Sequence, residues 1–330
     1  MPDQCTIPVM VLFGPTASGK TAVLEQLFTE PNPVFSSSEQ TCSEIVSADS
    51  AQVYRSMNIG TAKVSLEVRN KLPHHLIDIY DPREQFDAAE FIRLADIACI
   101  DIFSRGKLPV ISGGTGFYLK NFILGLSEAP PADAEIRKQL EAERAQCGIE
   151  RLAAELAVCD PVSAARIHIN DEYRLLRALE VYRSSGLPLS SFAASGSFKN
   201  RPSYRCLTIG LSCSREKLYE RINLRCAQMF QEGLAEEVRS LHEAGYKPTD
   251  PGLKAIGYKE FFVLDEKGNV KISDDLAEVE RLVARNSRRY AKRQILFFSS
   301  LPNVVWVETG DGMLDEIKQA LREFLADKNN

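Results

Sequence analysis

The sequence predicts an α/β fold with a parallel sheet, interrupted by an all-helical insertion. Three observations support this prediction. Short apolar runs alternate with amphipathic helical segments in the first half of the chain, as is typical of parallel sheets. Glycine-rich turns follow two of these runs directly. Between residues 132 and 182 only helical patterns occur, and strand-like runs return after them.

Composition places the chain among ordinary globular proteins. Of its 330 residues, 44% are hydrophobic and 26% are charged, and no apolar run approaches the roughly 20 residues of a membrane span. The net charge of −5 argues mildly against a protein that coats nucleic acid with a basic surface. No basic residue precedes Lys20, so no targeting leader is expected. Eight cysteines without a CxxC pair predict free thiols and a cytoplasmic protein.

The first half contains four candidate strands separated by helices. Each strand is a short apolar run bounded by turn residues, at 9–13, 45–48, 76–79 and 108–111. Helices are predicted at 21–28, 86–105 and 116–124. In the second helix one face is apolar and is formed by Phe91, Leu94, Ala95, Ala98 and Ile102. The stretch 31–44 is rich in Ser, Pro and Asn and is expected to be a loop.

The pattern changes at a Pro-Pro pair, where the predicted insertion begins. Residues 130–200 form the predicted helical domain, and its last part, 184–203, is a connection rich in Ser, Gly and Pro. The core is therefore assigned to 1–129 and 201–330. Its second part holds a strand at 206–210, a long helix at 276–298, a strand at 304–307 and a closing helix.

A glycine-rich motif lies between the first strand and the first helix. It fits GxxxxGK[ST] and consists of Gly14, Pro15, Thr16, Ala17, Ser18, Gly19, Lys20 and Thr21. Its backbone N–H groups and the helix N-terminus suit phosphate, while Lys20 reaches terminal phosphates and Thr21 suits Mg²⁺. The motif and its context predict a P-loop NTPase-like core that binds a diphosphate or triphosphate.

Two further sites follow strands of the same predicted sheet. Asp49 comes directly after the run 45–48, at the sheet edge where ligands bind in open α/β folds. Its position allows a Mg²⁺ ligand, a general base or a helix N-cap, and spacing does not choose among them. Gly113, Gly114 and Thr115 follow the strand at 108–111, so they either face the same crevice or form a simple glycine turn.

The long helix carries a cluster of positive charge. Five basic residues occur within nine positions without an acid: Arg285, Arg288, Arg289, Lys292 and Arg293. Such a cluster is either a solvated helix face or a surface that binds a polyanion. These residues alone indicate a P-loop enzyme acting on a phosphorylated compound, for which a small-molecule kinase is the default.

Eight ordered sequence blocks narrow this interpretation. Besides the GPTASGKT loop they are DSAQVY with IGTAK, PHHLID, GGTGFY, RIH with RLLRALE, Arg221-Ile222 with Arg225 and Met229, KAIGYK and AKRQ. Together they resemble the tRNA dimethylallyltransferases, in their bacterial form. The resemblance runs nearly end to end, and a single P-loop would be far less specific.

The resemblance implies transfer of a dimethylallyl group from dimethylallyl diphosphate to the N6 amine of adenosine 37, beside the tRNA anticodon. It implies Asp49 as general base, Thr115 at the reacting centre, and Lys20, Arg225 and Mg²⁺ at Thr21 as stabilisers of the leaving diphosphate. The Gly14–Thr21 motif would hold that diphosphate. The protein is expected to be monomeric and to lie away from membranes.

The resemblance also implies contacts with the tRNA anticodon stem-loop, part of them from the insertion. The implied residues are Asp49, Ser50, Ala51, Gln52, Thr115, Arg137, Tyr173, Arg174, Leu175, Leu176, Arg177, Lys254, Ala255, Ile256, Gly257, Tyr258, Lys259, Ser287, Arg288, Arg289, Tyr290, Ala291, Lys292, Arg293 and Gln294. The target base is expected to flip into a channel, at a cost of a few kcal/mol.

The sequence departs from the family pattern in three places, and other functions stay open. The stretch between Phe28 and Glu44 is longer than usual, Val64 replaces a proline, and residues 295–299 lack the usual threonine-tryptophan-phenylalanine-arginine run. The alternatives are an adenylate isopentenyltransferase acting on a free nucleotide, a P-loop kinase or ATPase, and a non-catalytic RNA-binding protein.

Overall fold

The computed structural model describes residues 6–29, 42–192 and 203–327. They group into two compact units, Met1–Ile123 with Arg201–Asn330, and Leu124–Asn200. The second unit begins six residues before the predicted boundary at 130, at Leu124, the last residue of the helix Gly116–Leu124. Most of the lengthened stretch between Phe28 and Glu44 lies outside the described residues.

A six-stranded sheet organises the first unit. Its strands are β1 (Ile7–Phe13), β2 (Ser43–Ser47), β3 (His74–His75), β4 (Leu108–Gly113), β5 (Tyr204–Ser212) and β8 (Val305–Glu308). Their order is β3-β2-β4-β1-β5-β8, and every neighbouring pair is parallel. The predicted α/β class is confirmed. Because the strands are parallel, the residues that follow β1, β2 and β4 meet at one edge.

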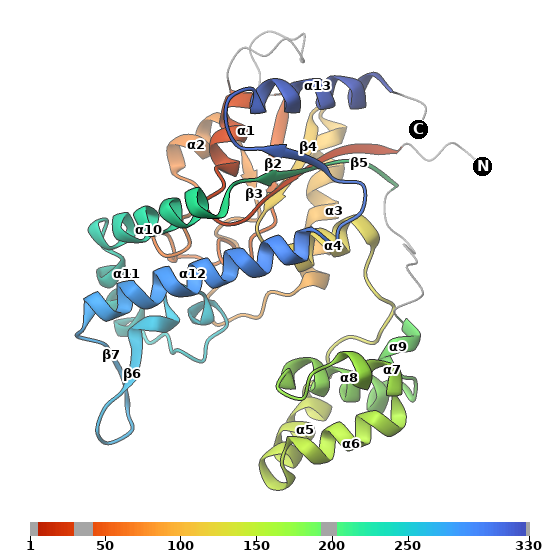
Figure 1. Ribbon diagram of the computed structural model, residues 1–330, viewed down its shortest axis with the longest axis vertical. Coiled ribbons are helices and arrows are strands. Elements are labelled where there is room, and N and C mark those ends of the chain that lie inside the picture. The colour runs from red at the N-terminus through yellow and green to blue at the C-terminus, as the bar shows by residue number, and fades with distance from the viewer. Residues whose placement is uncertain (1–5, 30–41, 193–202, 328–330) are drawn as a thin grey trace. The chain divides into compact units, whose positions relative to one another are not determined.

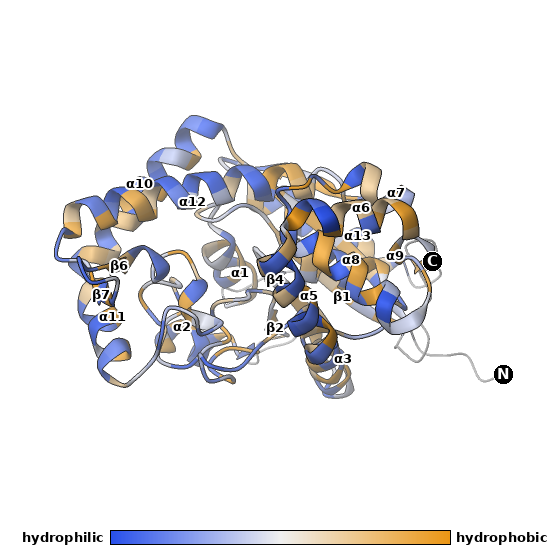
Figure 2. Ribbon diagram, turned by 90° about the horizontal axis from the view of Figure 1, so that it is seen from below, coloured by the Kyte–Doolittle hydropathy of each residue, from blue (hydrophilic) through white to orange (hydrophobic). Residues whose placement is uncertain are grey.

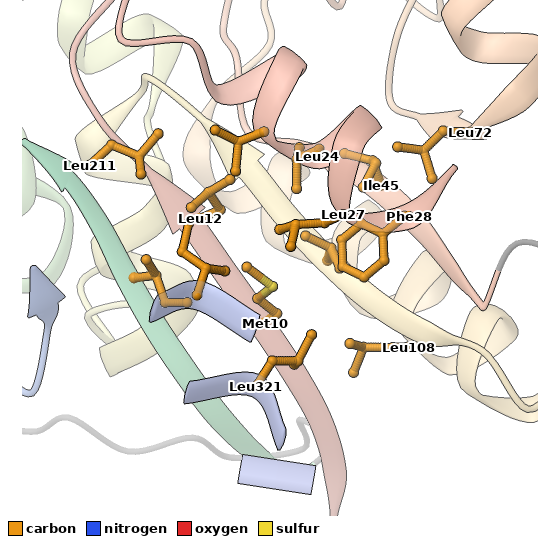
Figure 3. Packing of buried hydrophobic residues seen from close by; sticks show 14 of the residues in the cluster. Met10, Leu12, Leu24, Leu27, Phe28, Ile45, Leu72, Leu108, Leu211 and Leu321 are labelled. Atoms are coloured by element: carbon orange, nitrogen blue, oxygen red, sulfur yellow. The ribbon is translucent and has the colours of Figure 1, made fainter. Parts of the chain in front are cut away.

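Helices cover both faces of this sheet (Figure 1). On one face α1 (Lys20–Phe28) and α13 (Met313–Ala326) pack on inward side chains of β1, β2 and β4, and Figure 3 shows Met10, Leu12 and Leu27 within this core. On the other face lie α3 (Ala88–Ser104) and α4 (Gly116–Leu124), joined by the stacked rings of Phe91 and Tyr118. Burial on both faces explains why the strands read as continuous apolar runs.

The part of the first unit after β5 is mainly helical. Its elements are α10 (Arg215–Gln231), α11 (Leu234–Glu243), the short 3₁₀ turns Gly252–Lys254 and Lys259–Phe261, the hairpin β6 (Phe262–Leu264) and β7 (Val270–Ile272), and α12 (Leu276–Phe298). The bounds predicted for α12 are confirmed, and α10 packs alongside it. Figure 2 shows α12 mainly in the hydrophilic colour, and Val279, Val283, Ala291, Gln294 and Phe298 are its buried residues.

The strand predicted at 76–79 is wrong. The structure has a two-residue strand, His74–His75, and a short helix, α2 (Leu66–Lys71), shortly before it. Leu76 and Asp78 adopt left-handed backbone angles, with φ of 64° and 60°, which no strand accommodates. Ion pairs hold Asp78 there, with Lys63 at 2.5 Å and Arg69 at 2.9 Å. Tertiary charge pairing therefore overrides the apolar pattern.

The second unit is helical, as predicted. Its helices are α5 (Ala134–Cys147), α6 (Ile149–Cys159), α7 (Pro161–Arg166), α8 (Glu172–Ser185) and the unexpected four-residue α9 (Leu189–Phe192). Asp133, Asp160 and Asp171 accept hydrogen bonds from backbone N–H groups at the starts of α5, α7 and α8. Leucines from α5, α6 and α8 form a core of its own.

Within the described ranges, no helix combines the length and the apolar character that crossing a membrane requires. Cys147, Cys159, Cys213 and Cys226 are free thiols, as the spacing predicted.

Candidate active site

The Gly14–Thr21 loop connects β1 to α1 in a tight turn. Ala17 and Gly19 have φ of 63° and 91°, so the backbone reverses at both residues. A Cβ on Gly14 would lie 2.7 Å from the Ser18 hydroxyl, which explains the glycine there. The first helical residue of α1 is Lys20, and no side chain caps the helix. Its N–H groups therefore remain available to an anion.

Two cations stand beside this loop. The Lys20 ammonium donates to the carbonyls of Gly14 (2.9 Å) and Pro15 (3.0 Å), and Arg225 of α10 donates to the Thr16 hydroxyl (2.7 Å). Burial, and then the nearby Arg225 charge, lower the pKa of Lys20 to about 8, although Asp49 raises it. Burial also lowers the pKa of Arg225. A bound anion would stabilise both positive charges.

Asp49 follows β2 and anchors the next turn with one of its two oxygens. Its Oδ1 accepts from the backbone N–H groups of Ala51 (2.9 Å) and Gln52 (3.2 Å), while Oδ2 accepts from none of the described residues. Residues 50–53 form a turn and not a helix, so the N-cap interpretation is wrong. The Oδ2 atom is left for a ligand or a proton.

The turn after β4 is fastened to the turn after β2. Thr115 N–H donates to the carbonyl of Ala48 (3.1 Å), and its hydroxyl accepts from Ser50 N–H (3.0 Å). A Cβ on Gly113 would lie 2.1 Å from the Ala48 oxygen, so only glycine permits this approach. Thr115 therefore lies beside the Asp49 turn, as expected from the sheet edge.

The end of α12 joins the phosphate-binding side to this turn. Gln294 accepts from Thr16 N–H (2.8 Å) through Oε1 and donates to the Gly114 carbonyl (2.7 Å) through Nε2. Tyr290 donates to the same carbonyl (3.2 Å), and burial raises its pKa to about 12. Gln294 is only 4% exposed and both of its amide atoms are used, so this residue organises the site from within.

A cavity of about 300 Å³ lies between these elements. Its polar wall holds Asp49, Thr16 and Arg225, while its apolar wall comes mainly from α10, α12 and the 254–256 segment. The predicted site residues that line it are Thr16, Asp49, Ser50, Ala51, Arg225, Lys254, Ala255, Ile256, Ser287, Tyr290 and Arg293.

Sequence reasoning missed several residues of this cavity. They are Gly60, Thr61, Ile222, Cys226, Met229 and Val283. The sequence pattern could have indicated three of them, because positions 222, 226 and 229 lie on one face of the helix α10. The cavity thus brings together a carboxylate, a cation and an apolar wall, which suits a substrate with an anionic head and a hydrocarbon group.

Comparison with known proteins agrees with this chemistry. Residues 52–301 match a family model described as IPP transferase. The chain belongs to the IPP transferase family. A tRNA dimethylallyltransferase of Geobacter metallireducens is 43% identical over 324 residues, which cover 98% of this chain and 99% of the relative.

Two further comparisons extend this result. A tRNA dimethylallyltransferase of Geobacter sulfurreducens is 44% identical over 300 residues, covering 91% of each chain. The solved structure of the full-length tRNA isopentenylpyrophosphate transferase from Bacillus halodurans is 37% identical, with a TM-score of 0.63, covering 97% of this chain and 95% of that one. The IPP transferase fold therefore includes both the Gly14–Thr21 loop and Asp49, which precede the residues matched by the family model.

The basic cluster of this IPP transferase is largely exposed along α12. Arg289, Lys292 and Arg293 are exposed, and none of the three pairs with a carboxylate among the described residues. Arg288 donates to Asn223 of α10, and Arg293 lines the cavity. Ala291, in contrast, is buried.

The residues of the second unit that the resemblance implies as tRNA contacts likewise include both exposed and buried side chains. Tyr173 is 71% exposed, and the Arg137 guanidinium lies 5.0 Å from its ring centre. The Leu175 and Leu176 side chains lie in the core, so these residues pack the unit and their side chains are not available to a partner. Arg177 pairs with the buried Glu180 at 3.3 Å.

Proposed function

We propose that this IPP transferase moves a dimethylallyl group from dimethylallyl diphosphate to the exocyclic N6 amine of adenosine 37, 3′ to the anticodon of tRNAs, and releases diphosphate. One observation carries the proposal: Asp49 and Arg225 line the same cavity as Thr16 of the Gly14–Thr21 loop. The names of the relatives support the choice of tRNA and of the transferred group.

The proposed chemistry is a displacement at the allylic carbon. The N6 lone pair forms a bond to C1 of the donor as the C1–O bond breaks, and the electrons of that bond go to the diphosphate. The amine becomes acidic as the new bond forms, so a carboxylate within reach takes its proton. Asp49 is suited to this role because Oδ2 makes no hydrogen bond to the described residues, and general-base assistance is typically worth 10²–10⁴-fold.

The leaving diphosphate would be held by the Gly14–Thr21 loop. Lys20 would exchange its two carbonyl partners for phosphate oxygens, and Arg225 would neutralise charge from the opposite side. The exposed Thr21 hydroxyl, one residue after Lys20, fits Mg²⁺, an ion that takes most of its ligands from phosphates and water. Mg²⁺ bound there supplies further positive charge. No cluster of three acidic, His or Cys ligands exists among residues 6–29, 42–192 and 203–327, which agrees with an ion held mainly by substrate.

The tRNA would approach the apolar and basic side of the site. The exposed basic residues of α12, the 254–259 segment and the exposed side chains of Tyr173 and Arg174 are the proposed contacts, together with Arg137. A stacked base cannot reach Asp49, so adenosine 37 would flip into the cavity. We place the reaction in the cytoplasm and expect a monomer.

A three-way substrate panel tests this function. The protein is incubated with Mg²⁺ and labelled dimethylallyl diphosphate, and with either unmodified tRNA or adenosine monophosphate. A third reaction supplies ATP without the prenyl donor. The proposal predicts label in tRNA alone. Label in the free nucleotide would support the adenylate isopentenyltransferase alternative, and donor-independent ATP hydrolysis would support a kinase or ATPase.

A further inference from the structure

The carboxylate of Glu237, in α11, binds three consecutive backbone N–H groups of a distant loop. It accepts from Asn58 (2.9 Å), Ile59 (2.9 Å) and Gly60 (3.2 Å). The same carboxylate accepts from the Tyr258 hydroxyl at 2.6 Å. A single side chain thus joins α11, the loop 57–62 and the 254–258 segment.

Close backbone packing makes this junction rigid. A Cβ on Gly60 would lie 2.5 Å from the Tyr258 ring, and a Cβ on Gly257 would lie 3.0 Å from the Gly60 oxygen. Gly257 has a φ of 98°, which favours glycine further. Burial and the neighbouring carboxylate raise the pKa of Tyr258, so its hydroxyl keeps its proton and donates at any working pH.

Hydrogen bonds connect the junction around Glu237 to Asp49, the proposed base. Gly60 and Thr61 line the cavity, as do Lys254, Ala255 and Ile256. The side chain of Gln52 donates to the carbonyls of Thr61 (3.3 Å) and Ala62 (3.2 Å). The backbone N–H of that same Gln52 donates to Asp49 Oδ1. Hydrogen bonds therefore run from Glu237 through the loop to the Asp49 turn.

We propose that Glu237 is a positioning residue for the acceptor adenosine, because it fixes the loop 57–62 and the 254–258 segment as one wall of the cavity. Among the described residues its hydrogen bonds go to residues 58–60 and Tyr258, and none goes to the Gly14–Thr21 loop or Arg225. Loss of the Glu237 charge should therefore lower the efficiency with which tRNA is used as the acceptor, and it should leave the binding of dimethylallyl diphosphate unchanged. This inference rests on the proposed function.

Glu237→Gln tests the inference, and Glu236→Gln is its matched control. A glutamine keeps one acceptor oxygen but turns an N–H₂ donor toward backbone donors, so the three amides lose part of their pairing. Glu236 is the preceding residue in α11; it is exposed, and its ion pair within the described part of the chain is with Arg239, at 3.0 Å. The readouts are hydrogen exchange at the amides of residues 58–60, kcat/KM for tRNA and the Kd for dimethylallyl diphosphate.

For Glu237→Gln we expect faster exchange at residues 58–60 and kcat/KM for tRNA lower by about 10- to 100-fold, the range that loss of hydrogen bonds to a charged group produces. The diphosphate Kd should stay within twofold, and Glu236→Gln should match the wild type in all three. Equal loss of acceptor and donor binding would overturn the inference, as would unchanged tRNA kinetics.

A second variant keeps the test decisive if Glu237→Gln does not fold. Tyr258→Phe preserves the ring over Gly60 and removes one of the four donors, so a smaller loss, about two- to fivefold in kcat/KM for tRNA, is expected with an unchanged diphosphate Kd. An effect on the diphosphate Kd alone would contradict the inference. Absence of transfer by the wild type would instead refute the proposed function, while the exchange data would still test whether Glu237 anchors the loop.

Discussion

Asp49 has a structural role through one of its oxygens and the proposed chemical role through the other. Oδ1 accepts two backbone N–H groups and thereby fixes the orientation of the carboxyl group, while Oδ2 remains without a partner among the described residues. The cations Lys20 and Arg225 lie on the loop side of the same site. The proposed base and the proposed stabilisers of the leaving group are thus separate groups, so substitutions should affect the two roles separately.

Asp49→Asn should lower the single-turnover rate of transfer by about 10²–10⁴-fold, because the amide holds the turn through its oxygen but cannot take a proton. The affinity for tRNA should change less than threefold. Rapid quench with labelled donor measures the rate, and filter binding measures the affinity. Parallel loss of rate and affinity would argue that Asp49 only shapes the site.

The pH dependence of dimethylallyl diphosphate binding should report the protonation state of Lys20. Its lowered pKa means that the ammonium is charged below about pH 8 and loses its charge as the pH rises through that value. Affinity for dimethylallyl diphosphate, measured by calorimetry, should therefore fall above pH 8 and approach a tenfold loss per pH unit. Lys20→Arg stays charged over this range and should show no such fall. A constant wild-type affinity up to pH 10 would contradict this assignment.

At the level of elements, α12 serves both stability and function. Its buried end reaches the Gly14–Thr21 loop and the turn after β4 through Gln294, while its exposed residues carry the basic cluster. Phe297 of the same helix leaves no room for a Cβ on Gly116, at 2.5 Å. One helix therefore joins the Gly14–Thr21 loop to the turn after β4.

Gln294→Leu should destabilise the protein by about 2 kcal/mol, since the Thr16 N–H and the Gly114 carbonyl lose their partner where water is excluded. The donor Kd should rise as well. Gln228→Leu on α10 is the control, because Gln228 is exposed and its side chain donates to the nearby, equally exposed Glu232. Urea unfolding measures both variants. Equal stabilities would show that the Gln294 bridge contributes nothing.

The sequence predicted those elements that local pattern determines. The Gly14–Thr21 turn, the parallel strands and the bounds of α12 follow from glycine spacing and hydrophobic period. The position of the short strand β3 could not be predicted from local pattern, because cations distant in the sequence hold Asp78 in a left-handed conformation. Glu237 was also invisible, since its partners are backbone amides about 180 positions away and carry no side-chain signal.

For the whole molecule, charge distribution matters more than net charge. The chain carries −5 overall, yet five basic residues lie within nine positions of α12 without an intervening acid. A polyanion can therefore bind this helix although the protein is acidic. Binding of tRNA should depend steeply on salt, since counterions leave both the phosphates and this surface.

The double variant Arg289→Gln, Lys292→Gln should reduce the slope of log Kd against log salt for tRNA by about 1.5, from roughly 0.7–0.9 for each lost phosphate contact. Both side chains are exposed and without an ion pair to the described residues. Arg239→Gln, whose guanidinium pairs with Glu236, should leave the slope unchanged. If the double variant keeps the wild-type slope, these residues do not contact phosphate.

Nucleoside mass analysis of tRNA after reaction with dimethylallyl diphosphate and Mg²⁺ is the most direct test of the proposed transfer to adenosine 37. We expect one added C₅H₈ unit on the N6 atom of adenosine 37, and none on a tRNA that carries guanosine at that position. An unmodified adenosine 37, or a prenyl group on any other nucleoside, would contradict it.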